Sequence, residues 1–361
     1  MPNVDGSAPR RGRPIVQNVR MSRRFWVVLC CLGLVAGACS SSTPAAKPAA
    51  KQPSTTTKPP AVSTTSTTTA APKQVVVSAA PFQLPRGSAR AVLVADGDHL
   101  LLLGGFNGAK QTIAEILRID PTTKTVRSAG SLNAAVHDAA GALVGGRAMV
   151  FGGGNGSETS GVQAVGAEGT VSSIGKLPIP RSDLATATVG GRTFILGGYD
   201  GSTVRATTIA TADGTTFQIL GDLPTPVRYP AVAALGPKIY AIGGSTTGNT
   251  SGAVRAVQML DTTTGTVTAI GELPEPLTDA VAATIRGHIY VFGGQLAGRI
   301  SDQVWRLDVG PTGSGPVTLE PVATLPTPVT DAAVAVLGNT AYLVGGESPS
   351  VLSSITTLEI R

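Results

Sequence analysis

The sequence has few aromatic residues, few cysteines and no long apolar run. Aromatic side chains make up 4% of the 361 residues, and the three cysteines are Cys30, Cys31 and Cys39. So few cysteines, all in one short stretch, exclude a disulfide-stapled scaffold. No apolar run reaches the roughly 20 residues that a membrane-spanning helix needs. The 45 glycines and 26 prolines argue against a helical bundle.

Acidic residues are almost absent before residue 75, so the net positive charge lies in this N-terminal part. The formal net charge is +6, yet Asp5 is the only acidic residue among the first 74. Residues 75–361 hold 18 Lys and Arg against 21 Asp and Glu. A uniformly basic protein would suggest nucleic-acid binding. Because the C-terminal part is mildly acidic, we expect no nucleic-acid partner.

The N-terminal segment resembles a bacterial lipoprotein signal. Two arginines precede a run of 14 apolar residues at 25–38, the length of a signal-peptide core. The run ends in Val-Ala-Gly-Ala-Cys39, which is similar to the lipobox of that family. The resemblance implies cleavage after a signal peptide at 1–38, with Met21 as an alternative start, and acylation of Cys39. The protein would then be lipid-anchored to the extracytoplasmic face of the cell membrane; an ordinary cleaved signal is the alternative.

The segment that follows is low in complexity. Residues 40–74 are almost entirely Ser, Thr, Ala, Pro and Lys. Such a composition cannot bury enough apolar surface to offset the entropy of ordering. We therefore expect residues 39–74 to be the lipidated Cys39 plus a disordered tether that holds a globular head away from the membrane.

The remainder, 75–361, is built from repeats. A pair of glycines follows a short apolar run six times, at intervals of 45 to 52 residues. Repeats of this period indicate a propeller or solenoid. The pairs are Gly104-Gly105, Gly152-Gly153, Gly197-Gly198, Gly243-Gly244, Gly293-Gly294 and Gly345-Gly346.

Each repeat is predicted to form four strands. The first and second strands are joined by a tight turn that contains glycine, which accepts a positive φ. The first strand is rich in alanine, which suits the crowded axis of a radial array. A Leu-Pro pair follows the fourth strand, where proline is expected to end it. In the fifth repeat the predicted strands are residues 279–285, 288–292, 303–307 and 317–322.

The two ends of the repeat region complement each other. Residues 75–80 match a fourth strand, while the last repeat ends after its third strand, at 355–360. We therefore predict that the N-terminal strand completes the last blade, which removes an open sheet edge. The expected fold is an all-β, six-bladed propeller, and we expect it to be monomeric.

The Gly-Gly pair, the glycine turn and the Leu-Pro-x-Pro exit together resemble the kelch repeat family of β-propellers, over all of 75–361. Kelch repeats usually carry a Tyr and a Trp at positions where this sequence has aliphatic residues such as Leu307 and Val267. The resemblance implies that the connections between blades line the mouth of a central channel.

One position in those connections, six residues after the Leu of Leu-Pro, defines the candidate site. Four of its six occupants are aspartates, which could bind a cation, an amine or a polyol, or could accept turn N–H groups and join the blades. We favour the second interpretation for any single aspartate. Residues that break the repeat are the stronger ligand-binding candidates: Arg90, His137, Arg181, Arg228 and Tyr229. The aspartates are Asp138, Asp183, Asp279 and Asp331.

No catalytic or metal-binding motif stands out in 75–361. The region has no cysteine, and its three histidines, His99, His137 and His288, have no metal-ligand spacing. We predict no cofactor and no metal, and favour a module that binds a protein or glycan of the cell envelope. One alternative is a sugar-active enzyme similar to the periplasmic kelch-type sialate mutarotases. Its carboxylate substrate would be held by Arg90, Arg181 and Arg228. The other alternative is a structural spacer.

Overall fold

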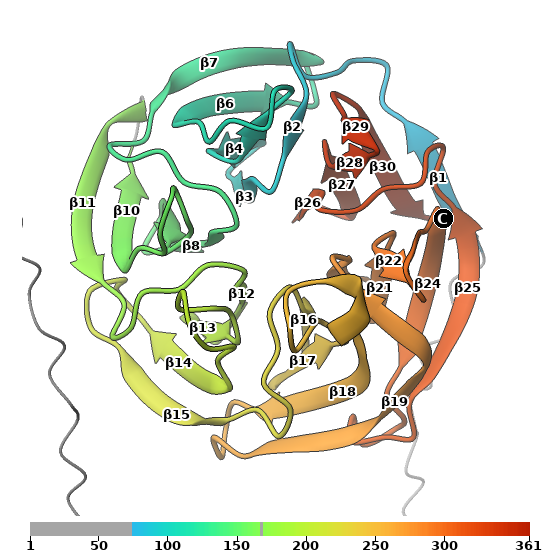
Figure 1. Cartoon of the computed structure of the whole chain (residues 1–361). Helices are drawn as coiled ribbons and strands as arrows, with labels where there is room; N and C mark the ends of the chain where they lie inside the picture. Colours follow the sequence, from blue (N-terminus) through green and yellow to red (C-terminus); the bar gives the residue numbers. More distant parts are fainter. Residues whose placement is uncertain (1–73, 167–168) are drawn as a thin grey trace, which may run out of the picture. The chain divides into compact units, whose positions relative to one another are not determined.

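Six antiparallel sheets stand around a central axis in the computed structural model (Figure 1), which describes residues 74–166 and 169–361. The chain is therefore a six-bladed β-propeller, and the predicted all-β fold is confirmed. The predicted signal peptide, Cys39 and the tether lie outside the described residues. Within the described residues, no helix is both long enough and apolar enough for a membrane crossing.

Each blade is a sheet whose strands lie side by side from the central axis outwards. Blade 1 contains β3 (Val92–Asp96), β4 (His99–Leu103), β6 (Glu115–Asp120) and β7 (Thr125–Ser131). Blade 2 contains β8 (Ala140–Val144), β9 (Arg147–Phe151), β10 (Gly161–Val165) and β11 (Val171–Lys176). Blade 3 contains β12 (Ala185–Val189), β13 (Arg192–Leu196), β14 (Thr207–Thr211) and β15 (Gln218–Asp222).

Blades 4 to 6 repeat the pattern, except that short strands extend the sheet of blade 4 and the N-terminal strand is the outer strand of blade 6. Blade 4 contains β16 (Ala231–Leu235), β17 (Lys238–Ile242), β18 (Val254–Asp261) and β19 (Val267–Thr278), and β22 (Gln295–Leu296) and β23 (Arg299–Ile300) extend its sheet. Blade 5 contains β20 (Val281–Ile285), β21 (His288–Phe292), β24 (Gln303–Asp308) and β25 (Thr318–Thr324). Blade 6 contains β26 (Ala333–Leu337), β27 (Thr340–Val344), β30 (Ile355–Ile360) and β1 (Val75–Ala79).

The closure of the last blade is confirmed. Strand β1 pairs antiparallel with β30, from Val75 opposite Ile360 to Ala79 opposite Thr356. The first and last strands of the propeller thus share one sheet, and the outer edge of β30 is covered.

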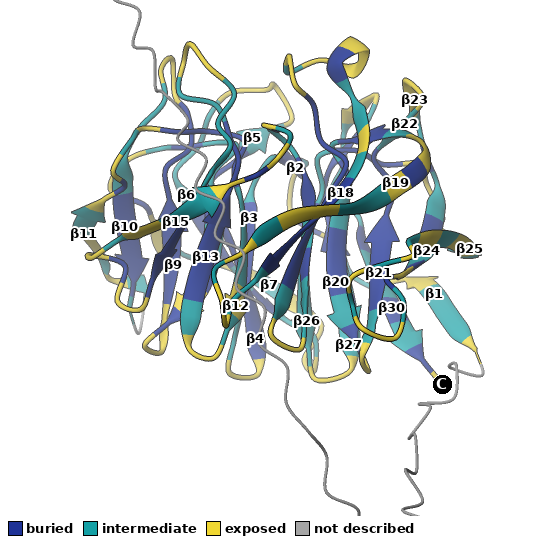
Figure 2. Cartoon of the chain, turned by 90° about the horizontal axis from the view of Figure 1, so that it is seen from below, coloured by how far each residue is buried: buried dark blue, intermediate teal, exposed yellow. Residues whose placement is uncertain are grey.

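The hydrophobic core lies between blades. Each of the six clusters of buried apolar side chains joins two neighbouring blades; Trp305 of blade 5, for example, packs with Tyr240 of blade 4. The exposed tips of the first hairpin of each blade lie on one face of the disc, and the short strands β5 (Phe106–Asn107), β22 and β23 lie on the other (Figure 2).

The glycine pairs hold the connections between blades in place. Gly243 has φ +62°, and a Cβ there would lie 2.2 Å from the carbonyl oxygen of Leu277, in the connection that leaves the same blade. The N–H of Gly244 donates to that same oxygen at 2.8 Å. The arrangement recurs in all six blades, with N–H to O distances of 2.7–2.9 Å. The glycine pairs therefore allow the backbone of each connection to approach closely.

One expectation about the outer strands is wrong in blade 4. Strand β19 continues through Pro274 and Pro276 to Thr278, where the sequence predicted an end at the Leu-Pro pair. The strand persists because Leu277 pairs with Val254 of β18 and also with Leu296 of β22. Proline is tolerated wherever the ladder does not need its N–H.

Candidate functional site

Six residues form what we call the mouth ring, one from each connection between blades: Arg90, Asp138, Asp183, Tyr229, Asp279 and Asp331. All six have φ between +51° and +56°. Aspartate tolerates this left-handed conformation better than most residues, whereas arginine and tyrosine rarely adopt it. The repeated aspartate therefore has a backbone reason, and the two exceptions are strained.

Backbone hydrogen bonds run around the mouth ring. For five of the six ring residues, the N–H donates to the carbonyl of the ring residue in the preceding connection. These backbone bonds join neighbouring blades, and the aspartate side chains lie at the channel mouth, where they pair with other side chains. The donor and acceptor pairs are Arg90 to Asp331 (2.9 Å), Asp138 to Arg90 (3.0 Å), Asp183 to Asp138 (2.8 Å), Tyr229 to Asp183 (2.9 Å) and Asp331 to Asp279 (3.1 Å).

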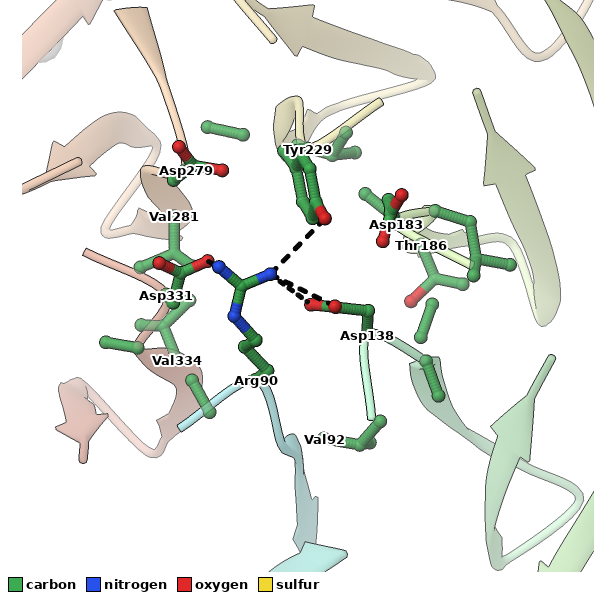
Figure 3. A pocket seen from close by; sticks show the side chains of 18 of the residues that line it. Arg90, Val92, Asp138, Asp183, Thr186, Tyr229, Asp279, Val281, Asp331 and Val334 are labelled. Atoms are coloured by element: carbon green, nitrogen blue, oxygen red, sulfur yellow. Dashed lines mark hydrogen bonds and ion pairs between the residues drawn. The ribbon is translucent and has the colours of Figure 1, made fainter. Parts of the chain in front are cut away.

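The ring side chains surround a central cavity of about 220 Å³ (Figure 3). Below the ring, its walls are the small and apolar residues of the inner strands, including Val92, Thr186 and Val281. The cavity thus has a charged entrance and an apolar interior.

Arg90 reaches across the entrance. Its Nη1 lies 3.1 Å from Asp138 Oδ2 and 3.3 Å from the hydroxyl of Tyr229, and its Nη2 lies 3.3 Å from Asp331 Oδ1. Its Nε donates to Glu347 at 3.3 Å, and Lys110 also pairs with Glu347. One guanidinium therefore connects residues from opposite sides of the channel (Figure 3).

Arg228 is held just as firmly beside the ring. It pairs with Asp183, and its Nη2 donates to the Tyr229 hydroxyl at 3.2 Å. Its guanidinium carbon lies 4.2 Å from the ring centre of Tyr199 and 4.9 Å from that of Tyr229. Two aromatic faces and one carboxylate fix this cation in place.

A second cavity, which we call the lateral pocket, adjoins the mouth ring and measures about 350 Å³. One of its walls is an aromatic stack, in which the rings of Phe106 and His137 lie 4.2 Å apart at 25°. His137 Nδ1 is 2.9 Å from the Thr112 hydroxyl, and burial lowers the pKa of His137, which keeps its imidazole neutral at neutral pH. Polar residues complete the lining: Asn155, Ser157, Glu158, Ser182, Arg228 and Tyr229.

Three carboxyls of the mouth ring, those of Asp183, Asp279 and Asp331, resist ionisation. Burial is the largest cause that raises the pKa of Asp183, Asp279 and Asp331, and nearby carboxylates raise it further. Arg90 opposes the shift at Asp279 and Asp331, and Arg228 opposes it at Asp183. The entrance therefore holds more buried carboxyl groups than its cations neutralise.

The structure brings together eight of the nine predicted ligand-binding residues. Six form the mouth ring, and His137 and Arg228 line the lateral pocket. Arg181 lies apart: it is fully buried, and its Nη1 donates to the carbonyls of Gly197 at 3.1 Å and Thr207 at 3.0 Å. Arg90, Arg181 and Arg228 therefore do not converge on one carboxylate.

Two contributors to the site were not identified from the sequence. Glu347 and Glu158 lie in loops between the second and third strands, where Gly and Asn indicate only turns. A usable signal does exist for Glu347, because it directly follows a glycine pair. In every blade the backbone at that position pairs with the residue before the ring, as Glu347 does with Thr330.

No group of three or more His, Cys, Asp or Glu within 74–166 and 169–361 is arranged to hold a metal ion. The site is thus built from ion pairs, aromatic faces and hydroxyl groups.

Comparison with known proteins supports the fold. The sequence model of the KLHDC2/KLHL20/DRC7 Kelch-repeats domain matches residues 187–361, just under half of the chain. A solved structure titled "Structure of YjhT" superposes with a TM-score of 0.63 at 14% identity, over 75% of this chain and 95% of that chain. No curated protein sequence matches. The 914 matching chains of solved structures show how widely the fold occurs, so function has to be argued from the site.

Proposed function

We propose that this kelch-type propeller is a binding module of the cell envelope, lipid-anchored at Cys39, which holds a protein or glycan at the mouth ring and lateral pocket. The observation that carries the proposal is the pair of adjoining cavities lined by fixed charges and aromatic faces. Ligand sites in proteins are typically preformed concavities of this kind.

The fixed network favours binding over a reaction at the arginines. Arg90 and Arg228 are each paired with carboxylates and stacked on aromatic rings, so they keep their positions without a ligand. Preorganised side chains lose little entropy when a ligand arrives. The site therefore suits recognition of a defined shape.

Binding is tested by thermal shift of the mature, detergent-solubilised chain against envelope glycans and peptides, followed by titration of any hit. Arg228→Ala should weaken binding at least tenfold. Arg192→Ala is the matched control, because Arg192 lies in a hairpin on the opposite face, where its side chain interacts with Gln218 and Phe194. Equal affinities for the two variants would contradict a site at the mouth.

The anchor is tested separately. Radiolabelled palmitate should enter the wild-type chain and be absent from Cys39→Ser, which should also leave the membrane fraction. Label retained in Cys39→Ser would refute lipidation at this residue.

A sugar-active enzyme is the second candidate. One observation favours it: burial raises the pKa of Asp183 beside Arg228, and a raised carboxyl pKa suits a general acid. Turnover of a sugar substrate that is lost in Asp183→Asn would establish it. A structural spacer would show neither binding nor turnover, and it would tolerate Arg228→Ala and Asp183→Asn.

A further inference from the structure

One carboxylate that lines the lateral pocket takes no part in the ion pairs of Arg90 and Arg228. Arg90 and Arg228, its two guanidinium groups, are already paired with Asp138 and Asp183. Glu158 makes no side-chain hydrogen bond or ion pair with any other described residue, and it is half-buried in the lining. A cationic group of a ligand would therefore find its counter-ion at Glu158.

The carboxylate of Glu158 lies against a glycine of the next blade. A Cβ at Gly201 would lie 2.6 Å from Glu158 Oε2, so the carboxylate would have to shift if a side chain stood there. The carboxylate thus rests against the backbone of the loop that follows Tyr199.

The remaining walls suit a sugar ring. The neutral stack of Phe106 and His137 gives an apolar face, on which the C–H groups of a pyranose can lie. The hydroxyl of Tyr229, the amide of Asn155 and the hydroxyl of Ser157 supply donors and acceptors for ring hydroxyls.

We propose that the lateral pocket binds an amino sugar with a free ammonium group, with Glu158 as the counter-ion and Phe106–His137 as the stacking face. The inference rests on the proposed function and narrows it to cationic glycans. A lysine side chain shares the charge, but it would leave the aromatic face and the hydroxyl partners unused in a pocket of about 350 Å³.

The experiment is calorimetric titration of the mature chain with two oligosaccharides, a tetramer of glucosamine and a tetramer of N-acetylglucosamine. The glucosamine tetramer should bind at least tenfold more tightly, because acetylation removes its charge. Glu158→Gln should weaken that binding at least tenfold and leave the weaker binding of the acetylated tetramer unchanged. The melting temperature of Glu158→Gln should match the wild type, which separates lost binding from lost folding.

Glu272→Gln is the matched control, because Glu272 is an exposed glutamate of β19 whose side chain forms an ion pair with Arg255 and lines neither cavity. Equal binding of the two tetramers, or binding insensitive to Glu158→Gln, would overturn the inference and leave the proposed glycan-binding function standing. Binding of an oligolysine peptide instead of glucosamine, lost in Glu158→Gln, would also overturn the sugar assignment. Binding of no glycan or peptide, with Arg228→Ala also without effect, would refute the proposed function itself.

Discussion

Arg181 is a buried cation, and we expect the folded propeller to be more stable when its charge is removed. It occupies a repeat position, two residues before the mouth ring, where four of the other five blade connections bury an apolar side chain. Those residues are Val136, Val227, Leu277 and Val329. Replacing Arg181 with methionine removes the charge and keeps a flexible, unbranched side chain that fills part of the same space.

The magnitude follows from the contacts of the guanidinium. Nε and Nη2 of Arg181 have no hydrogen-bond partner among the described residues, and no described carboxylate pairs with it. Burial, together with repulsion from Arg205, lowers the pKa of Arg181 to about 10. A shift from 12.5 to about 10 corresponds to about 3 kcal/mol against the charged form. Loss of the two Nη1 hydrogen bonds costs roughly 1 kcal/mol each.

Arg181→Met should therefore stabilise the fold by about 1 kcal/mol, consistent with other replacements of buried charges by apolar residues. For a domain of this size the melting temperature should rise by roughly 2–4 °C. The assay is thermal unfolding followed by circular dichroism at pH 7. Val227→Met is the control, since it makes the same residue at the equivalent position without removing a charge.

A fall in melting temperature for Arg181→Met, with Val227→Met unchanged, would refute the reasoning. It would mean that the two unpartnered N–H groups are satisfied in solution. Ligand binding should be unaffected by Arg181→Met, because Arg181 lines neither cavity.

Three further predictions concern closure, the glycine pairs and pH. Deleting residues 75–81 should lower the melting temperature by more than 10 °C, because it removes β1 and uncovers β30; an unchanged melting temperature would disprove the closure. Gly243→Ala should destabilise the fold by more than 2 kcal/mol in urea titrations, because its Cβ would meet the Leu277 carbonyl at 2.2 Å. Gly190→Ala, with φ +57° and nothing within 4 Å, should cost only the roughly 1–2 kcal/mol of a left-handed alanine, and equal losses would contradict the role of the clash. Burial raises the pKa of Asp279 to about 6, so the folded state binds more protons than the unfolded state between pH 4 and 6. Its contribution to stability should be full below pH 4 and decline as pH rises through about 6, and thermal melts of Asp279→Asn should show a shallower decline; parallel profiles would exclude Asp279 as the source.

The sequence was sufficient for the fold because a propeller repeats one local pattern. Each blade needs the same glycines, since each connection passes within contact distance of the same backbone; Gly243 and Leu277 show the geometry that every blade shares. The number of blades follows from counting the glycine pairs, and the closing strand follows from counting the strands at the two ends of the repeat region. The sequence did not predict that β19 continues past Pro274, because β22, with which the end of β19 pairs, belongs to the next repeat.

The sequence alone therefore determined the architecture and the six positions of the mouth ring, because both depend on backbone conformations that repeat with the chain. Only the tertiary structure decided what the side chains do. Arg90 meets Asp138, Tyr229, Asp331 and Glu347 because the ring closes on itself, and no sequence spacing encodes those distances. Arg181 lies two residues before its ring residue and turns into the core, whereas Arg228 lies one residue before its own and turns towards the pocket. Side-chain direction at a blade connection is set by packing against neighbouring blades, which a linear pattern does not contain.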